Sequence, residues 1–272
     1  MPAPTSTTSL QISETQPEQP YQEVDAICQT HGRYVARLVE YNLFDKPTSH
    51  KTGCPSCAAE RKAENEAKKL ARQRAEREEK IAALVSRSSI PSRFADRTFD
   101  GYRATLPGQK IALGVCRAYA DGWKEREEQG ASLVLTGMPG TGKTHLACAI
   151  ANAVMREHMA SALFVPVAVM MRAIKSTYRQ DSQRTEQQVI DQLVEQDLLI
   201  LDEVGVNIGS EHEKLLMFEV LNERYQELKP TILISNLNTD DLEDFLGQRV
   251  MDRYRECGSV IAFNWDSHRG AK

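Results

Sequence analysis

A glycine-rich segment near the middle of the chain has the residue types and spacing of a phosphate-binding loop. The sequence from Gly137 to Thr144 fits G-x-x-x-x-G-K-[ST] without a mismatch. Backbone N–H groups of such a loop surround phosphate oxygens, Lys143 reaches the β- and γ-phosphates, and Thr144 ligates Mg²⁺. The residues expected to bind the nucleotide here are Gly137, Met138, Pro139, Gly140, Thr141, Gly142, Lys143 and Thr144.

Two carboxylates after an apolar run predict the second half of the same site. Asp202 and Glu203 follow the sequence LLIL, so we expect Asp202 beside Mg²⁺ and Glu203 in position to polarise the attacking water. Asn236 follows the sequence TILIS and is either the polar residue that orients this water or an ordinary turn residue. The chain contains no N-K-x-D motif for guanine. These residues therefore favour ATP and predict its hydrolysis.

Three cysteines and a histidine near the N-terminus have the spacing of a metal site. Cys28-x-x-His31 and Cys54-x-x-Cys57 are separated by 22 residues, and two such pairs form a closed tetrahedral Zn²⁺ site of the structural kind. His50 is the alternative to His31 as the fourth ligand. The other cysteines are expected to be small buried apolar residues, namely Cys116, Cys148 and Cys257.

Hydrophobic patterning predicts the elements that position these groups. Short apolar runs alternate with helical patterns in the second part of the chain, which is typical of an α/β domain with a parallel sheet. The expected strands are 132–136, 162–167, 197–201, 231–235 and 260–263. The expected division is a disordered tail (1–20), a zinc-binding module (21–57), a charged helical connector (58–87) and an ATPase domain (88–272).

Composition excludes some classes of partner. The 34 Lys and Arg against 38 Asp and Glu give a formal charge of −4, so any binding to nucleic acid must be local rather than spread over the surface. No apolar run approaches the roughly 18 residues of a membrane span, and the first twenty residues do not resemble a secretory signal. We expect a cytoplasmic protein without a membrane partner.

Five segments together resemble the DnaC helicase-loader family of AAA+ ATPases over residues 88–272. They are TGMPGTGKTHLA, DLLILDEVG, ISN, LGQRVMDRYRE and FNWDSHR. The resemblance implies an ATPase that binds the replicative hexameric DNA helicase and helps place it on single-stranded DNA. It also implies that Asn236 is sensor 1, that Arg253 is an arginine finger acting on a neighbouring copy, and that Arg269 is the sensor 2 arginine. Self-association of the ATPase domain follows from the finger.

The same resemblance suggests where single-stranded DNA binds. Lys175 and Tyr178 are three residues apart, which offers a cation for phosphate and a ring for base stacking. Ser210 aligns with a further contact position, whereas His212 stands where a tyrosine is expected. Packing of Tyr178 within the fold is the alternative.

The chain also departs from the usual pattern of its AAA+ relatives. Only seven residues follow Trp265, so we expect no substantial C-terminal helical lid. The N-terminal module is more similar to the zinc-bearing domain of DnaI-type loaders, and it binds either helicase or DNA. Two other functions stay open: an IstB-like regulator of transposition, and a zinc-dependent adaptor that uses ATP only structurally.

Overall fold

The computed structural model describes residues 21–43, 46–206 and 210–268. The predicted tail 1–20 and Arg269 lie outside these residues. The chain divides into two compact units, with the boundary between Ala75 and Glu76. No helix in the described part of the chain is both long and apolar enough to span a membrane.

The first unit contains a small antiparallel sheet followed by a helix. The strands β1 (Tyr21–Cys28), β2 (Gly32–Leu43) and β3 (Lys46–Lys51) pair in that order, and α1 (Pro55–Arg87) begins after them. Among residues 21–41 and 46–75, whose burial the structure describes, only Ala26, Ala36 and Cys54 are buried. Because three small side chains cannot stabilise a domain by hydrophobic burial alone, this unit needs another source of stability.

Helix α1 has 33 residues, none of them buried. Its Ala- and charge-rich sequence favours helix, and the structure confirms the helical segment predicted at 58–87. Within the second unit, Leu84 and Val85 near its C-terminal end pack against the core.

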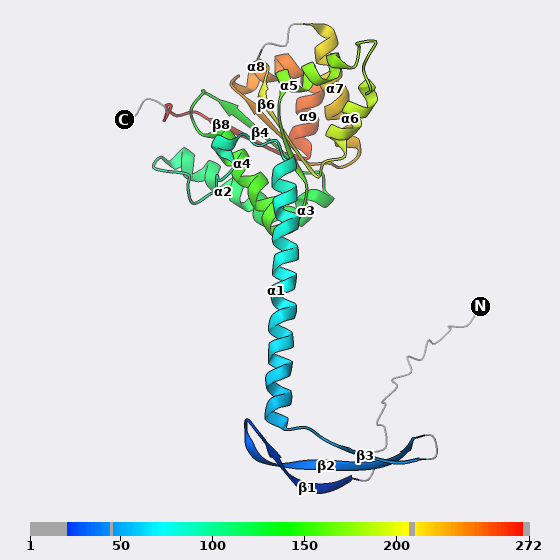
Figure 1. The fold of residues 1–272 in the computed structure, drawn as a ribbon. Helices are drawn as coiled ribbons and strands as arrows, with labels where there is room; N and C mark the ends of the chain where they lie inside the picture. The colour runs from blue at the N-terminus through cyan, green and yellow to red at the C-terminus, as the bar shows by residue number, and fades with distance from the viewer. Residues whose placement is uncertain (1–20, 44–45, 207–209, 269–272) are drawn as a thin grey trace, which may run out of the picture. The chain divides into compact units, whose positions relative to one another are not determined.

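The second unit is built on a parallel sheet, as predicted. The strands are β4 (Ser132–Gly137), β5 (Ala162–Pro166), β6 (Leu198–Val204), β7 (Thr231–Ser235) and β8 (Gly258–Phe263). Their order in the sheet is β5-β6-β7-β4-β8, and every neighbouring pair is parallel (Figure 1). The C-terminal ends of β4, β6 and β7 therefore meet at one edge, which brings the predicted phosphate loop and acidic pair together.

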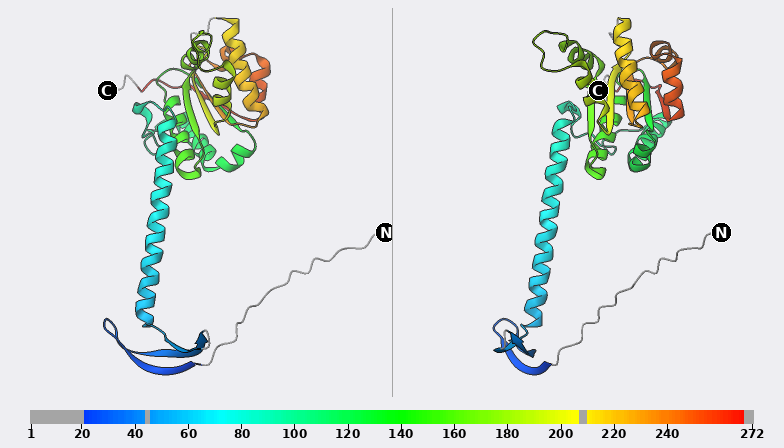
Figure 2. Two further views of the ribbon diagram at one scale, coloured as in Figure 1. Left: turned by 45° about the vertical axis from the view of Figure 1, so that its right-hand side comes forward. Right: turned by 90° about the vertical axis from the view of Figure 1, so that its right-hand side faces the viewer.

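Helices cover both faces of this sheet (Figure 2). The helices after α1 are α2 (Pro107–Asp121), α3 (Trp123–Glu128), α4 (Lys143–Ala153), α5 (Val167–Ser176), α6 (Glu186–Val194), α7 (Glu211–Gln226), α8 (Thr239–Leu246) and α9 (Gln248–Glu256). Alternate strand residues face opposite sides: Ile200 packs with α2 and α4, whereas Leu199 packs with α5, α6, α7 and α9. Cys116 and Cys148 are buried as predicted, but Cys257 is partly exposed.

Strand β6 continues further than the sequence predicted. The expected strand ended at Leu201, with the two carboxylates after it. The structure extends β6 to Val204, with an irregularity in its pairing to β7 between Leu201 and Val204. Glu203 has a φ of 62°, and a conformation of this kind interrupts the regular ladder and re-aims side chains.

Candidate nucleotide site and metal centre

The phosphate loop connects β4 to α4 and needs glycine at its two ends. Gly137 and Gly142 have φ values of 117° and 101°, a region that other residues rarely adopt. A Cβ at Gly137 would lie 2.5 Å from Phe263 O, and one at Gly142 would lie 2.5 Å from the Tyr102 ring. The pattern of glycines in the sequence thus reflects both backbone conformation and close packing.

Lys143 is the first residue of α4 and lies under the phosphate loop. Its Nζ donates hydrogen bonds to Gly137 O at 2.6 Å and to Met138 O at 2.8 Å, and the residue is only 4% exposed. The loop and the N-terminus of α4 therefore place an ammonium group and a helix dipole together, an arrangement suited to binding an anion.

The acidic pair lies next to the phosphate loop. Thr144 Oγ1 donates a hydrogen bond to Asp202 Oδ2 at 3.2 Å, and Asp202 Oδ1 accepts one from Glu203 N at 2.8 Å. Burial raises the pKa of the Asp202 carboxyl, which means that its negative charge is stabilised poorly by the surrounding protein. A divalent cation beside Thr144 and Asp202 would compensate for this loss of solvation. Glu203 is exposed.

A cleft of about 390 Å³ brings the phosphate loop, the acidic pair and Asn236 together. Its lining includes Lys143, Thr144, Asp202, Glu203 and Asn236, which come from α4, from β6 and from the segment after β7. The spacing of these residues along the chain is wide, but the sheet order makes them neighbours.

One wall of the cleft was not identified from the sequence. Arg93, Phe94 and Arg97 also line the cleft. They belong to the segment SRFADR (92–97), which is separated from the end of α1 by residues 88–91. An aromatic residue between arginines at the start of the expected ATPase domain is the only sequence signal that points to them.

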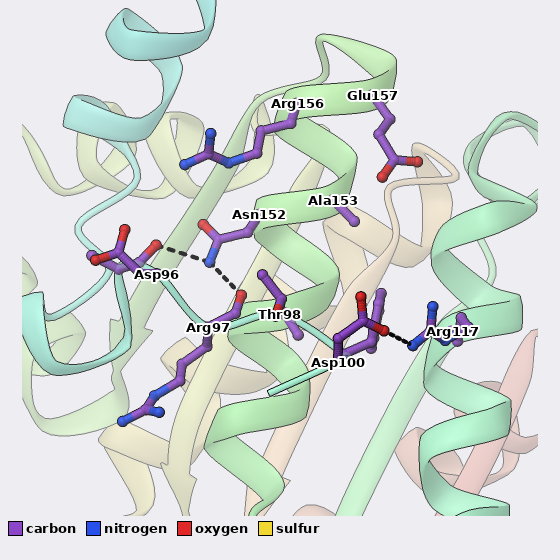
Figure 3. A pocket seen from close by; sticks show the side chains of 12 residues that line it. Asp96, Arg97, Thr98, Asp100, Arg117, Asn152, Ala153, Arg156 and Glu157 are labelled. Atoms are coloured by element: carbon purple, nitrogen blue, oxygen red, sulfur yellow. Dashed lines mark hydrogen bonds and ion pairs between the residues drawn. The ribbon is translucent and has the colours of Figure 1, made fainter. Parts of the chain in front are cut away.

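Asn152 of α4 holds this wall in place. Its Nδ2 donates to Ala95 O at 3.0 Å and to Arg97 O at 2.9 Å (Figure 3). These residues also border a neighbouring hollow of about 350 Å³. At its rim, Arg117 pairs with Asp100 at 2.6 Å (Figure 3). Helix α4 thus carries Lys143 at its start and, near its end, Asn152, which holds the backbone of this wall.

Of the two arginines predicted to act on the nucleotide from the C-terminal region, the structure describes only Arg253. Arg253 is on α9, donates a hydrogen bond to Asn222 Oδ1, and lies 4.9 Å from the centre of the Tyr225 ring. Arg253 does not belong to the described residues that line the cleft of its own chain. Arg269 lies outside the described residues.

The four residues predicted to contact DNA lie around the end of α5 and the start of α7. Lys175 Nζ pairs with Glu213 Oε1 at 2.7 Å, and Tyr178 Oη is 3.0 Å from His212 Nε2. Tyr178 is 53% exposed, so it is not a core residue. Ser210 caps α7, because its hydroxyl accepts a hydrogen bond from Glu213 N at 3.2 Å.

The predicted metal ligands converge at one point in the first unit. The ligand atoms of Cys28, His31, Cys54 and Cys57 all lie within 4.8 Å of one another. His31 Nδ1 is 3.3 Å from Cys57 Sγ, and Cys28 Sγ is 3.4 Å from the same sulfur. His50 is not part of this cluster of described residues. Three sulfurs and one nitrogen at these separations fit a tetrahedral Zn²⁺ ion.

Local structure explains the convergence. The β1–β2 turn places Cys28 opposite Gly32, and Cys54 and Cys57 lie at the start of α1. Hydrogen bonds from the backbone N–H groups of His31 and Thr30 lower the pKa of the Cys28 thiol to about 6, which favours the thiolate that binds metal.

Glu60 completes the surroundings of this cluster. His31 Nε2 lies 3.0 Å from Glu60 Oε1, an arrangement that leaves Nδ1 facing the three sulfurs. A carboxylate in this position orients a histidine ligand and increases its basicity.

Comparison with known proteins gives the relationship of the chain. A family model described as IstB-like ATP binding protein matches residues 118–270. The replicative helicase loader DnaC of Escherichia coli strain K12 is 37% identical over 198 residues, which cover 72% of this chain and 79% of the relative.

Two solved structures share the fold. A crystal structure of the DnaC helicase loader has a TM-score of 0.57 at 23% identity and covers 63% of this chain and 99% of its own. A crystal structure of DnaI has a TM-score of 0.56 at 23% identity and covers 66% of this chain and 95% of its own. At this level of identity, the two similarities show that the chain shares their fold.

Proposed function

Because this chain belongs to the DnaC-like group of IstB-like ATP-binding proteins, we propose that it is an ATP-dependent helicase loader. It binds the replicative hexameric DNA helicase and helps place it on single-stranded DNA in the cytoplasm. The observation that carries the proposal is the 37% identity to DnaC over 198 residues. The cleft formed by the phosphate loop and the acidic pair supports it.

The proposed chemistry is hydrolysis of ATP in this cleft. The phosphate loop and Lys143 bind the phosphates, and Thr144 and Asp202 hold Mg²⁺. Glu203 accepts the proton of the attacking water, and Asn236 orients that water. The proton moves to the Glu203 carboxylate as the water oxygen bonds to the γ-phosphorus and the bond to ADP breaks. When bound, Mg²⁺ neutralises charge on the phosphates.

A second copy of the chain completes the proposed site. Arg253 lies on α9 and is not among the described residues that line its own cleft, which supports action on the nucleotide of a neighbouring copy. A guanidinium supplied in this way stabilises the transition state only when copies are assembled. Hydrolysis then depends on self-association. The role of Arg269 as the sensor 2 arginine remains a proposal from the sequence.

The surface around Tyr178 is the proposed site for single-stranded DNA. Its ring is exposed, and Lys175 and His212 lie on the neighbouring elements. An exposed ring with a lysine nearby is suited to base stacking and phosphate contact without sequence preference. Ser210 has a structural role, because its hydroxyl caps α7. A contact with DNA would be a second role of the same residue.

The N-terminal unit is the proposed partner-binding end, with Zn²⁺ as its structural ion. Four protein ligands leave no open position, so the metal supports folding rather than catalysis. The small sheet presents exposed apolar side chains, among them Ile27 (78% exposed) and Val35 (56% exposed), which supports a protein partner, the helicase, over DNA.

Affinity capture tests the function. The tagged chain is mixed with the replicative helicase of its own host in ATP and in ADP, and we expect a helicase complex whose amount differs between the two nucleotides. The description of the matching family also favours an IstB-like regulator of transposition. Recovery of a transposase without helicase would support that alternative and contradict the loader.

A further inference from the structure

Residues 264–268 follow β8, cross the phosphate loop, and are called the C-terminal strap here. Thr141 O accepts hydrogen bonds from Trp265 Nε1 at 3.0 Å and from Tyr102 Oη at 3.2 Å. Gly140 O accepts one from His268 N at 3.0 Å. Thr141 is fully buried, so its carbonyl is satisfied by these donors rather than by bulk water. Two consecutive loop carbonyls are thus held from outside the loop.

Holding these carbonyls also orients two N–H groups. In a planar trans peptide the C=O and the N–H point in opposite directions. The carbonyl of Gly140 shares its peptide plane with the N–H of Thr141, and the carbonyl of Thr141 shares its plane with the N–H of Gly142. Because the carbonyls are turned toward the strap and Tyr102, these two N–H groups are turned the other way. Consecutive N–H groups with a common direction form an anion-binding concavity.

The strap is itself firmly attached to the core. The Trp265 ring lies 4.8 Å from the ring of the fully buried Phe263 and contacts α2, where a Cβ at Gly108 would be 3.2 Å from it. At the other end, Gln109 Nε2 lies 2.9 Å from His268 Nε2. Gln109 is 1% exposed, and its Oε1 accepts hydrogen bonds from the backbone just before α2.

We propose that the C-terminal strap holds the phosphate loop in its anion-binding form, with Trp265 as the positioning residue. The inference rests on the proposed nucleotide site and extends it to the C-terminal segment. Trp265 is not among the described residues that line the cleft, so it acts through the loop. By linkage, nucleotide binding stabilises the docked strap, and anything that displaces the strap weakens nucleotide binding by the same factor.

The test compares the two tryptophans of the full-length chain. Trp265→Phe keeps an aromatic ring and removes the donor to Thr141, so affinity for fluorescent ATP and ADP is expected to fall about 3- to 10-fold. KM rises with the dissociation constant, whereas kcat changes less. Trp123→Phe is the matched control, because Trp123 is fully buried and its Nε1 has no partner among the described residues. Affinity in this control stays within about twofold of the wild type.

A second variant separates positioning from general destabilisation. Tyr102→Phe removes the other donor to the same carbonyl, so the double variant with Trp265→Phe leaves Thr141 O without a side-chain donor. The loss of affinity in the double variant should exceed the product of the single losses. Unchanged nucleotide affinity in Trp265→Phe would overturn the proposed role of the strap. A loss in the double variant equal to the product of the two single losses would overturn it as well. Absence of nucleotide binding in the wild type would instead overturn the nucleotide site.

Discussion

The two units of the chain obtain their structure from different sources. In the first, only three small side chains are buried among residues 21–41 and 46–75, and the ligand atoms of the four candidate metal ligands lie within 4.8 Å of one another. In the second, β4 and β7 are buried throughout their lengths, with helices on both faces. A site built on a hydrophobic core is positioned whether or not its ligand is bound, whereas a metal-held unit depends on its ion.

Removal of the metal is expected to have the largest effect. Chelation, or Cys54→Ser with Cys57→Ser, should abolish zinc binding and unfold the small sheet, because the remaining core is too small. Hydrogen exchange of β1 to β3 together with metal analysis would measure this. The thermal transition of the second unit should remain. Stoichiometric zinc with an intact sheet in the double variant would contradict the assignment.

Loss of the proposed catalytic base comes next. Glu203→Gln should lower ATP turnover by about 10²- to 10⁴-fold and leave nucleotide affinity and zinc content unchanged. Steady-state phosphate release and nucleotide titration provide the measurements. Glu211→Gln, which changes an exposed carboxylate on α7, is the control and should retain turnover. Full activity in Glu203→Gln would remove this residue from the mechanism.

A substitution that leaves a cavity in the second unit tests how far this unit depends on its hydrophobic core. Leu199→Ala removes a fully buried side chain from β6 and should lower the free energy of unfolding of this unit by about 2–5 kcal/mol. Denaturant titration followed by the fluorescence of Trp123 and Trp265, which both belong to this unit, would show the loss. Zinc content should not change, and metal loss in this variant would indicate that the two units do not derive their stability independently.

The smallest expected effect concerns Glu60, whose carboxylate contacts the candidate metal ligand His31. Glu60→Gln weakens the orientation of His31 and should reduce zinc affinity about 10- to 100-fold, as measured by competition with a chelator. Glu64→Gln is a matched control one turn further along α1, where Glu64 pairs with Lys68 instead. Equal affinities in the two variants would show that Glu60 does not support the site.

Much of the second unit is predictable because its signals are local. The phosphate loop combines glycine conformations with a preceding strand and a following helix, and the strands are continuous apolar runs. The β-sheet of the first unit was not predicted, because charged residues on its exposed strands obscure the alternation. The extension of β6 past Leu201 was also missed, since its carboxylates resemble the end of a strand.

Features that depend on tertiary contact were not accessible from the sequence. Arg93 and Phe94 enter the cleft wall because Asn152 holds the backbone of the following residues. Trp265 reaches the phosphate loop because β8 pairs next to β4. In both cases the contact joins segments that are far apart in the chain, and no local pattern specifies such a pairing.

Helicase loading itself tests the central claim most directly. The replicative helicase of the host is mixed with circular single-stranded DNA, ATP and the chain, and the helicase retained on the DNA is quantified after separation from free protein. We expect the zinc-bound wild-type chain to increase the amount of helicase on DNA, and the metal-depleted chain to lose this effect while still binding nucleotide. Equal retention of helicase with and without the zinc-bound chain would contradict the account.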